Sequence, residues 1–217
     1  MLVTARRILL PAAALALAAT GCSDGGDEAA SPGQAASEVC GGFARQPDAA
    51  AALEAIAGEG ARLTSDPSEP ARVLSELRKA ARTPQSGKQR MKGVPFCVLE
   101  TAGDEKNVLD ITFREALAVP GTGGVKDIAT IYSTGRRATS SDLYASVYFT
   151  CALPAPAHTI VLDAELERAD ENEADHPGIR EEQITLANAA ARHVAAALGC
   201  ESTGLVEGVP GNAKARS

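Results

Sequence analysis

Residues 143–153, Leu-Tyr-Ala-Ser-Val-Tyr-Phe-Thr-Cys-Ala-Leu, decide the fold, because every second residue is apolar or small. In a strand successive side chains point to opposite faces, so these alternate residues share one face. Residues 107–117 and 158–168 alternate in the same way, and the shorter stretches 94–99 and 128–132 are also typical of strands. The pattern predicts an antiparallel sheet of about four to five strands with one face covered.

Helical periodicity precedes and follows these strands. Residues 46–58 begin with a proline in the first turn and end at a glycine, and a second helix follows the turn at 65–70. The strongest helix is expected over 179–199, where apolar residues recur every three or four positions. The order of helices, strands and helix predicts an α+β fold, with N-terminal helices and a C-terminal helix packed on the sheet.

The first residues have the pattern of an export signal. Arg6 and Arg7 precede an uncharged apolar run that is shorter than the roughly 20 residues needed to span a bilayer. The run ends in Ala19-Thr20-Gly21-Cys22, which resembles the lipobox of bacterial lipoproteins, although Ala19 stands where Leu is usual. The resemblance implies that residues 1–21 are a lipoprotein signal peptide and that the Cys22 thiol carries the lipid. The alternative is an ordinary signal peptide with Cys22 as a bystander.

The lipid would determine where the protein is located. Two acyl chains give stable anchoring, so we expect a protein bound to the cell membrane through Cys22, on the extracytoplasmic face. Residues 22–37 are small, polar and acidic, which predicts a flexible tether. Residues 38–200 are expected to form a single domain, and the Gly-rich residues 201–217 a disordered tail.

The charge argues against one class of partner. The formal net charge is −7, and nucleic-acid binding needs clustered Lys and Arg, so no nucleic-acid partner is expected. Cleavage after Gly21 removes Arg6 and Arg7 and leaves a formal side-chain charge of −9. Because an anionic membrane repels an acidic domain, we expect the domain to work away from the lipid surface.

The five cysteines divide into one anchor and four others. With Cys22 set aside, an even number of cysteines in an exported domain predicts two disulfides. Their placement beside expected helices and strands favours Cys40–Cys97 and Cys151–Cys200. The rival connectivity pairs Cys97 with Cys151 and Cys40 with Cys200.

Candidate catalytic residues are scattered. The sequence contains no G-x-S-x-G, H-E-x-x-H or Walker A motif. His158 and His176, with nearby acids, are candidates for a dispersed active site, but roles in a strand start and a turn are favoured for them. His193 is predicted to be a partly exposed helix residue. Arg136 and Arg137 could contact an anion, although a solvated loop is the favoured interpretation.

An acidic cluster is the one candidate for a metal site. Carboxylates at this density can hold Ca²⁺, but their spacing is not that of an EF-hand loop, which favours a solvated strand-to-helix loop. No cofactor is expected. The candidate ligands are Asp170, Glu171, Glu173 and Asp175.

Several short motifs occur in the order found in one bacterial family. After the lipobox and tether come Val39-Cys40-Gly41-Gly42-Phe43, Phe96-Cys97, Tyr148-Phe149-Thr150-Cys151 and Leu198-Gly199-Cys200. The chain resembles uncharacterised small secreted lipoproteins of actinobacteria, and its 15 Arg against six Lys suit a high-GC organism. The resemblance supports the location and the disulfides and implies no catalytic residues.

These observations together predict a non-enzymatic, membrane-anchored extracytoplasmic module that binds a small molecule or a protein partner of unknown specificity. One alternative is an envelope enzyme with a dispersed active site. Another is a solute-binding accessory subunit of a transporter.

Overall fold

The computed structural model describes residues 33–83, 92–121, 128–169 and 178–213. The expected signal peptide, the lipid-bearing Cys22 and most of the expected tether therefore lie outside the described residues. The acidic candidate ligands between residues 170 and 175, and His176, also lie outside them. No helix within the described ranges is long and apolar enough to cross a membrane.

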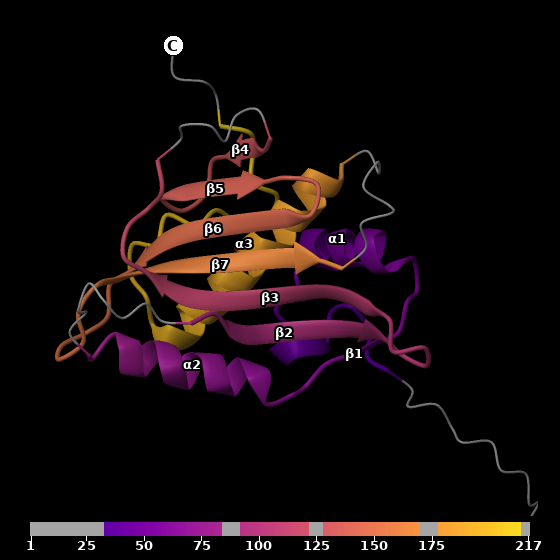
Figure 1. The fold of residues 1–217 in the computed structure, drawn as a ribbon, viewed down its shortest axis with the longest axis horizontal. Coiled ribbons are helices and arrows are strands. Elements are labelled where there is room, and N and C mark those ends of the chain that lie inside the picture. The colour runs from indigo at the N-terminus through magenta and orange to yellow at the C-terminus, as the bar shows by residue number, and fades with distance from the viewer. Residues whose placement is uncertain (1–32, 84–91, 122–127, 170–177, 214–217) are drawn as a thin grey trace, which may run out of the picture.

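The chain forms the expected α+β fold around one antiparallel sheet (Figure 1). The strand order is β1-β2-β3-β7-β6-β5-β4, so one run of adjacent strands, β1 to β3, joins another, β4 to β7, through the pairing of β3 with β7. The strands are β1 (Leu63–Thr64), β2 (Val94–Thr101), β3 (Asn107–Ala116), β4 (Thr130–Tyr132), β5 (Arg137–Ser140), β6 (Tyr144–Cys151) and β7 (Ile160–Arg168).

The sheet has seven strands, so the expectation of four to five is wrong. The two additional strands are β1, which is only two residues long, and β5, which reads Arg-Ala-Thr-Ser. Neither carries an alternating apolar pattern long enough to indicate a strand. Both are held by backbone pairing to longer neighbours, β2 and β6.

The register places apolar side chains in rows across one face of the sheet. In one row Phe113 pairs with Ala164, Ala164 with Val147, and Val147 with Ala138. All four are fully buried. This buried face is the one that the alternation in residues 143–153 predicts.

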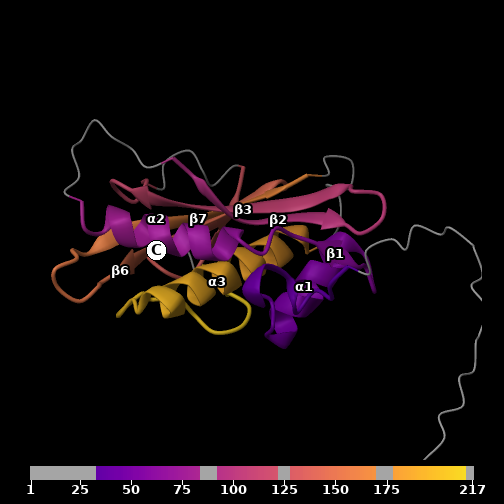
Figure 2. The same ribbon diagram turned by 90° about the horizontal axis from the view of Figure 1, so that it is seen from below.

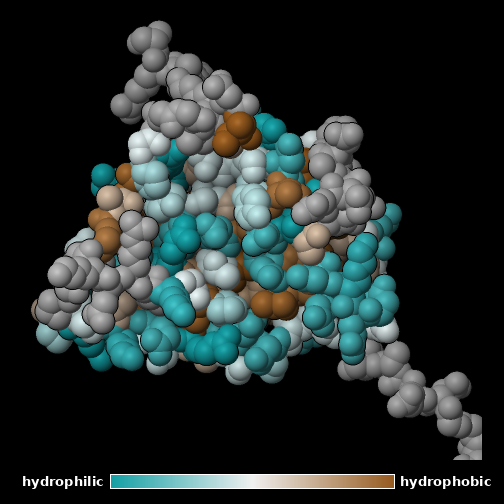
Figure 3. All heavy atoms as spheres, viewed as in Figure 1, coloured by the Kyte–Doolittle hydropathy of each residue, from teal (hydrophilic) through white to brown (hydrophobic). Residues whose placement is uncertain are grey.

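Helices cover this apolar face (Figure 2). The C-terminal helix α3 (Ile179–Leu198) packs on β5, β6 and β7, as expected, and α1 (Pro47–Ala57) packs on α3. The helix α2 (Glu69–Ala80) lies along β2 near the sheet's edge. A short 3-10 turn, η1 (Val39–Gly41), precedes α1. The opposite face has no helix among the described residues, and polar side chains occupy much of it (Figure 3).

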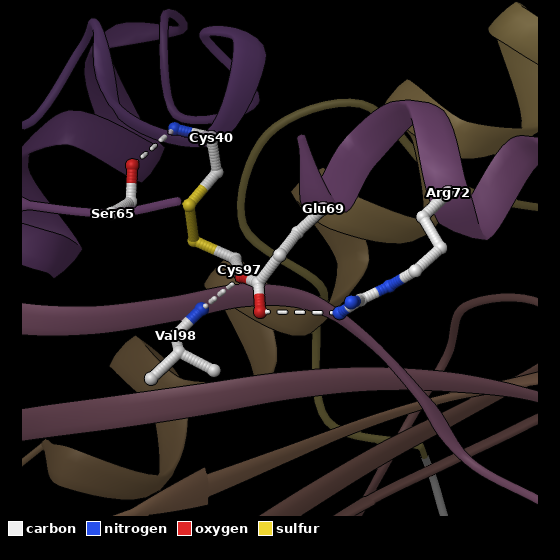
Figure 4. The surroundings of a disulfide bond; sticks show 6 residues. All are labelled: Cys40, Ser65, Glu69, Arg72, Cys97 and Val98. Carbon is white, nitrogen blue, oxygen red and sulfur yellow. Dashed lines mark hydrogen bonds and ion pairs between the residues drawn. A yellow bond between two sulfur atoms is a disulfide. The ribbon is translucent and has the colours of Figure 1, made fainter. Parts of the chain in front are cut away.

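Two disulfides fasten helical segments to strands. Cys40–Cys97 joins η1 to β2, and Cys151–Cys200 joins the end of β6 to the residue after the C-cap of α3. These are the pairs that the placement of the cysteines favours. Figure 4 shows the first bridge, beside the start of α2.

The C-terminal segment differs from its expectation. A disordered tail is wrong for residues 201–213, because Glu201 pairs with Ala152, Gly204 accepts from Gly135, and residues 211–213 lie along the outer edge of β4. Ser133 N–H donates to the Gly211 carbonyl, and Ala213 N–H donates to the Ile131 carbonyl. Gly-rich composition does not reveal this pairing, since backbone groups of any residue can form it. At the other edge Gln34, inside the expected tether, pairs with Leu63.

Candidate functional site

A cleft of about 240 Å³ lies between the start of α1 and one side of α3. Its walls come from three distant parts of the chain: the segment around η1 and α1, one face of α3, and the C-terminal segment. The lining residues are Gly42, Phe43, Arg45, Gln46, Asp48, Ala49, Thr185, Asn188, Ala189, Arg192, His193 and Gly208.

The α3 wall follows from helical spacing. Its five residues recur at intervals of three, one, three and one, which places them on one side of the helix. Two of them already have partners. Thr185 Oγ1 donates to the Glu181 carbonyl (2.7 Å), and Asn188 accepts from Thr134 Oγ1 (2.6 Å) and donates to the Val206 carbonyl (2.9 Å). The amide of Asn188 therefore fastens the C-terminal segment to α3.

His193 is the half-buried titratable group of the cleft. Its ring lies against Phe96, with ring centroids 5.8 Å apart. A Cβ added at Gly41 would come within 3.5 Å of Nε2, so η1 also closes on the imidazole. Burial, and then the positive charge of Arg45, lower the pKa of His193 below its ordinary value. Within the described part of the chain its imidazole forms no hydrogen bond.

Charged groups surround the imidazole unevenly. Arg192 Nη2 lies 3.1 Å from Glu207 Oε1, so this guanidinium is neutralised at the rim. Arg45 is exposed and forms no ion pair with any described residue. Asp48 lies beside Gly208, where an added Cβ would come within 3.0 Å of Oδ2. The unpaired charges facing the cleft are therefore one guanidinium and one carboxylate.

The cleft has the chemistry of a small polar binding site. A guanidinium and an imidazole N–H can both donate to a carboxylate or phosphate oxygen. The volume is below the 300–1,000 Å³ typical of sites for drug-sized ligands, which favours a small molecule or the end of a partner's side chain. The lining contains no serine or cysteine, and its threonine hydroxyl donates to a backbone carbonyl, so it offers no free hydroxyl or thiol nucleophile.

A second polar cluster lies on the helix-free face of the sheet. Arg114 Nη2 lies 2.5 Å from Asp163 Oδ2 and 2.9 Å from Glu165 Oε2. Ser146 Oγ donates to the other oxygen of Asp163 (2.6 Å). Desolvation lowers the pKa of Arg114, but Asp163 and then Glu165 raise it, and the net shift is upward. Because both oxygens of the buried Asp163 have partners, this network stabilises three neighbouring strands.

The structure separates the other residues singled out from the sequence. His158 Nε2 lies 3.9 Å from Glu115 Oε1, outside the α1–α3 cleft. Arg136 is exposed, whereas Arg137 is buried and donates to the carbonyls of Pro120 and Gly121. No group of three or more potential metal ligands occurs in the described ranges.

Comparison of the chain with protein-family models, curated proteins and solved structures finds no match. The site therefore rests on geometry alone. Sequence reasoning missed Arg45 and Asp48 because no local motif marks them. It placed His193 at a partly exposed helix position, which the structure has, but it could not show that η1 closes over the ring. The available signal was the spacing of Thr185, Asn188, Ala189 and Arg192 beside His193 on α3.

Proposed function

We propose that the protein is a lipid-anchored, extracytoplasmic, non-enzymatic binding module, and that the anionic group of its ligand occupies the cleft between α1 and α3. The observation that carries this proposal is that Arg45 and the His193 imidazole, which forms no hydrogen bond with a described residue, line the same preformed hollow. Both groups can donate hydrogen bonds to the same anion. The lipobox resemblance at Cys22 supports the anchor.

The walls of the cleft are held in place before a ligand arrives. Cys40, which precedes the lining segment, is bonded to β2, and Cys200, which follows α3, is bonded to β6. Asn188 links the α3 wall to the C-terminal segment. Such preorganisation lowers the entropy cost of binding.

Binding rather than catalysis is supported by the donor set. The cleft offers a guanidinium, an imidazole and a carboxylate, but no free hydroxyl or thiol that one of them could activate. Its anion affinity is expected to increase as the pH falls. Acidification protonates His193 and adds a positive charge, and a bound anion stabilises that charge against the repulsion from Arg45. At neutral pH the negative charge of Asp48 offsets the positive charge of Arg45, and Arg192 is paired with Glu207. The net charge of the site is therefore close to zero before His193 is protonated.

Titration with inorganic phosphate and with citrate tests the ligand site. Isothermal titration calorimetry should detect millimolar or tighter binding, and the His193 ring resonances should shift during an NMR titration. Arg45→Ala should weaken binding about tenfold or more, because it removes a charge-assisted hydrogen bond. Arg136→Ala removes an exposed guanidinium elsewhere and is the matched control, with less than a twofold effect. The absence of binding by both anions up to about 10 mM would contradict the proposed site.

The anchor has an independent test. In an actinobacterial host, metabolic labelling with palmitate should mark the mature protein, and mass spectrometry should find the lipid on the N-terminal Cys22 peptide. Cys22→Ala should abolish the label and release the protein from the membrane fraction. An unlabelled wild-type protein beginning at another residue would show that the lipobox resemblance is misleading.

A further inference from the structure

The chain carries a basic segment that its acidic net charge conceals. Residues 72–92 contain seven of the 21 Lys and Arg residues and a single acid, Glu76, which gives this segment a formal charge of +6. The rest of the mature chain therefore carries −15. We define the α2 basic patch as the exposed residues Arg72, Arg78, Lys79, Arg82 and Lys92. Lys88 and Arg90 lie outside the described residues and are not part of it.

Nearby acids leave most of this positive charge uncompensated. Arg72 Nη2 lies 3.5 Å from Glu69, and Lys79 Nζ lies 3.9 Å from Glu76, so both pairs are loose. Arg78 donates to the Ala197 carbonyl at the end of α3, which compensates no charge (2.8 Å). The helix dipole stabilises one or two cations in the last turn of a helix, which is a structural reason for Arg78 and Lys79. Arg82 and Lys92 lie beyond the end of α2, so the helix dipole does not account for the presence of these two cations.

The surface at the end of α2 is shaped as well as charged. A shallow hollow there is lined by Ser75, Arg78, Lys79, Arg82 and Thr83. Three cations and the Ser75 hydroxyl around one hollow suit a phosphate-bearing surface, whereas the Thr83 hydroxyl already donates to the Lys79 carbonyl. In Figure 1, α2 lies on the same edge of the sheet as β1, beside which the described chain begins. Ten residues lie between Cys22 and Gly33, and the chain from Cys22 to Gly33 can span up to about 40 Å when extended.

We propose that the α2 basic patch docks the domain on the anionic phospholipid surface to which Cys22 is anchored. The choice of surface rests on the lipid anchor of the proposed function, because the anchor holds the patch within reach of the headgroups. Each Lys or Arg near an anionic surface contributes favourably, and the attraction decays within a Debye length. The acidic remainder of the domain is repelled, so the two effects together orient the molecule with α2 toward the lipid. This orientation replaces the expectation, drawn from net charge, that the domain works away from the membrane.

Vesicle co-sedimentation tests the proposal with unlipidated protein, the mature chain from residue 22 to residue 217 carrying Cys22→Ser. It should bind phosphatidylcholine vesicles containing about one-third phosphatidylglycerol and not vesicles of phosphatidylcholine alone, and binding should disappear by about 0.5 M salt. The double variant K79E/R82E should weaken binding to the anionic vesicles by about tenfold or more. Arg78 is left intact because its hydrogen bond joins α2 to α3.

The matched control is K106E/R136E, which changes the net charge equally at exposed positions outside α2. It should weaken binding less than twofold. No binding to anionic vesicles at low salt, equal losses in the two double variants, or binding to soluble polyphosphate but not to vesicles would each overturn the docking proposal. Because the protein tested carries no lipid and the patch lies outside the α1–α3 cleft, these outcomes are independent of the palmitate and phosphate experiments.

Discussion

Gly135 shows how one residue controls a chain reversal in this sheet. It lies between β4 and β5 with φ of +59°, a conformation that disfavours residues with a Cβ. An added Cβ would collide with the Tyr148 carbonyl oxygen. The backbone here is held by two hydrogen bonds. Gly135 N–H donates to the Gly204 carbonyl, and Arg136 N–H donates to the Tyr148 carbonyl.

Gly135→Ala is therefore expected to lower the free energy of unfolding by about 2 kcal/mol or more. Urea denaturation of the oxidised domain measures the change. Gly211→Ala, where an added Cβ meets no atom within 4 Å, is the control and should cost less than about 0.5 kcal/mol. Equal costs at the two positions would show that the collision is relieved without strain.

Glu69 is a buried carboxylate beside the first disulfide (Figure 4). Its Oε2 accepts from Val98 N–H (2.9 Å), which joins the first turn of α2 to β2. Burial raises the pKa of Glu69, and the hydrogen bond from Val98 and the charge of Arg72 oppose that shift only partly. The folded protein therefore holds the proton of Glu69 to a higher pH than the unfolded chain does.

The linkage sets the sign of a pH effect. Stability from protonated Glu69 is lost as the pH rises from the unfolded pKa, about 4.5, through the higher folded pKa. Glu69→Gln keeps an oxygen that accepts from Val98 N–H but places no charge in the buried site. The free energy of unfolding of the variant should therefore be higher than that of the wild type at neutral pH. The difference should close below about pH 4.5. Urea denaturation across this range checks it, and a variant less stable than the wild type at pH 7 would show that the Arg72 pair outweighs burial.

Among the elements, α3 is tied to the sheet by packing and by a covalent bond. Its buried residues include four alanines, each of which contributes little buried apolar area, while Ile184 and Leu186 contribute much more. The Cys151–Cys200 bridge closes a segment with a sequence separation of 49 and fixes the end of the helix to β6. A disulfide that closes such a loop restricts the unfolded chain.

Replacing Cys151 and Cys200 together by Ala should lower the free energy of unfolding by about 3–4 kcal/mol. The measurement is urea denaturation with Cys40–Cys97 intact, which peptide mapping verifies. A loss below about 1 kcal/mol would show that α3 packing alone holds the helix in place.

Helices and strands were predictable from the sequence where buried side chains recur at a regular spacing over about eight or more residues. The strands β3, β6 and β7 bury alternate side chains over eight to ten residues, so period-two alternation marks them. The strand β5 buries Ala138 and Ser140 and directs Thr139 outward, a pattern too short and too polar to indicate a strand. The cleft was not predictable because Arg45 and His193 become neighbours only when α1 packs on α3.

At the scale of the whole molecule, segments near both ends of the described chain pair with edge strands of the sheet. The segment 211–213 hydrogen-bonds along β4, and Gln34 pairs with β1. Exposed strand edges template association with other chains, and the C-terminal segment removes this exposure at β4. The C-terminal segment also supplies the Val206 carbonyl to Asn188 and one wall of the cleft.

A chain that ends at Cys200 should therefore lose about 2–3 kcal/mol of unfolding free energy, because the polar groups of Thr134 and Asn188 lose their partners. It should also associate through β4. Denaturation and analytical ultracentrifugation measure these effects. A chain ending at Ala213 should match the full-length protein, and equal stability of both truncations would contradict a structural role for the segment.

The sequence alone predicts the α+β class, the main strands and helices, and two disulfides, because these depend on local periodicity and on counting cysteines. The lipid anchor is a prediction of the same kind. Only the tertiary structure reveals the seven-stranded order, the closed β4 edge and the α1–α3 cleft. The physical reason is that these features depend on which surfaces pack together, and the contacts join residues far apart in the chain whose types are locally unremarkable.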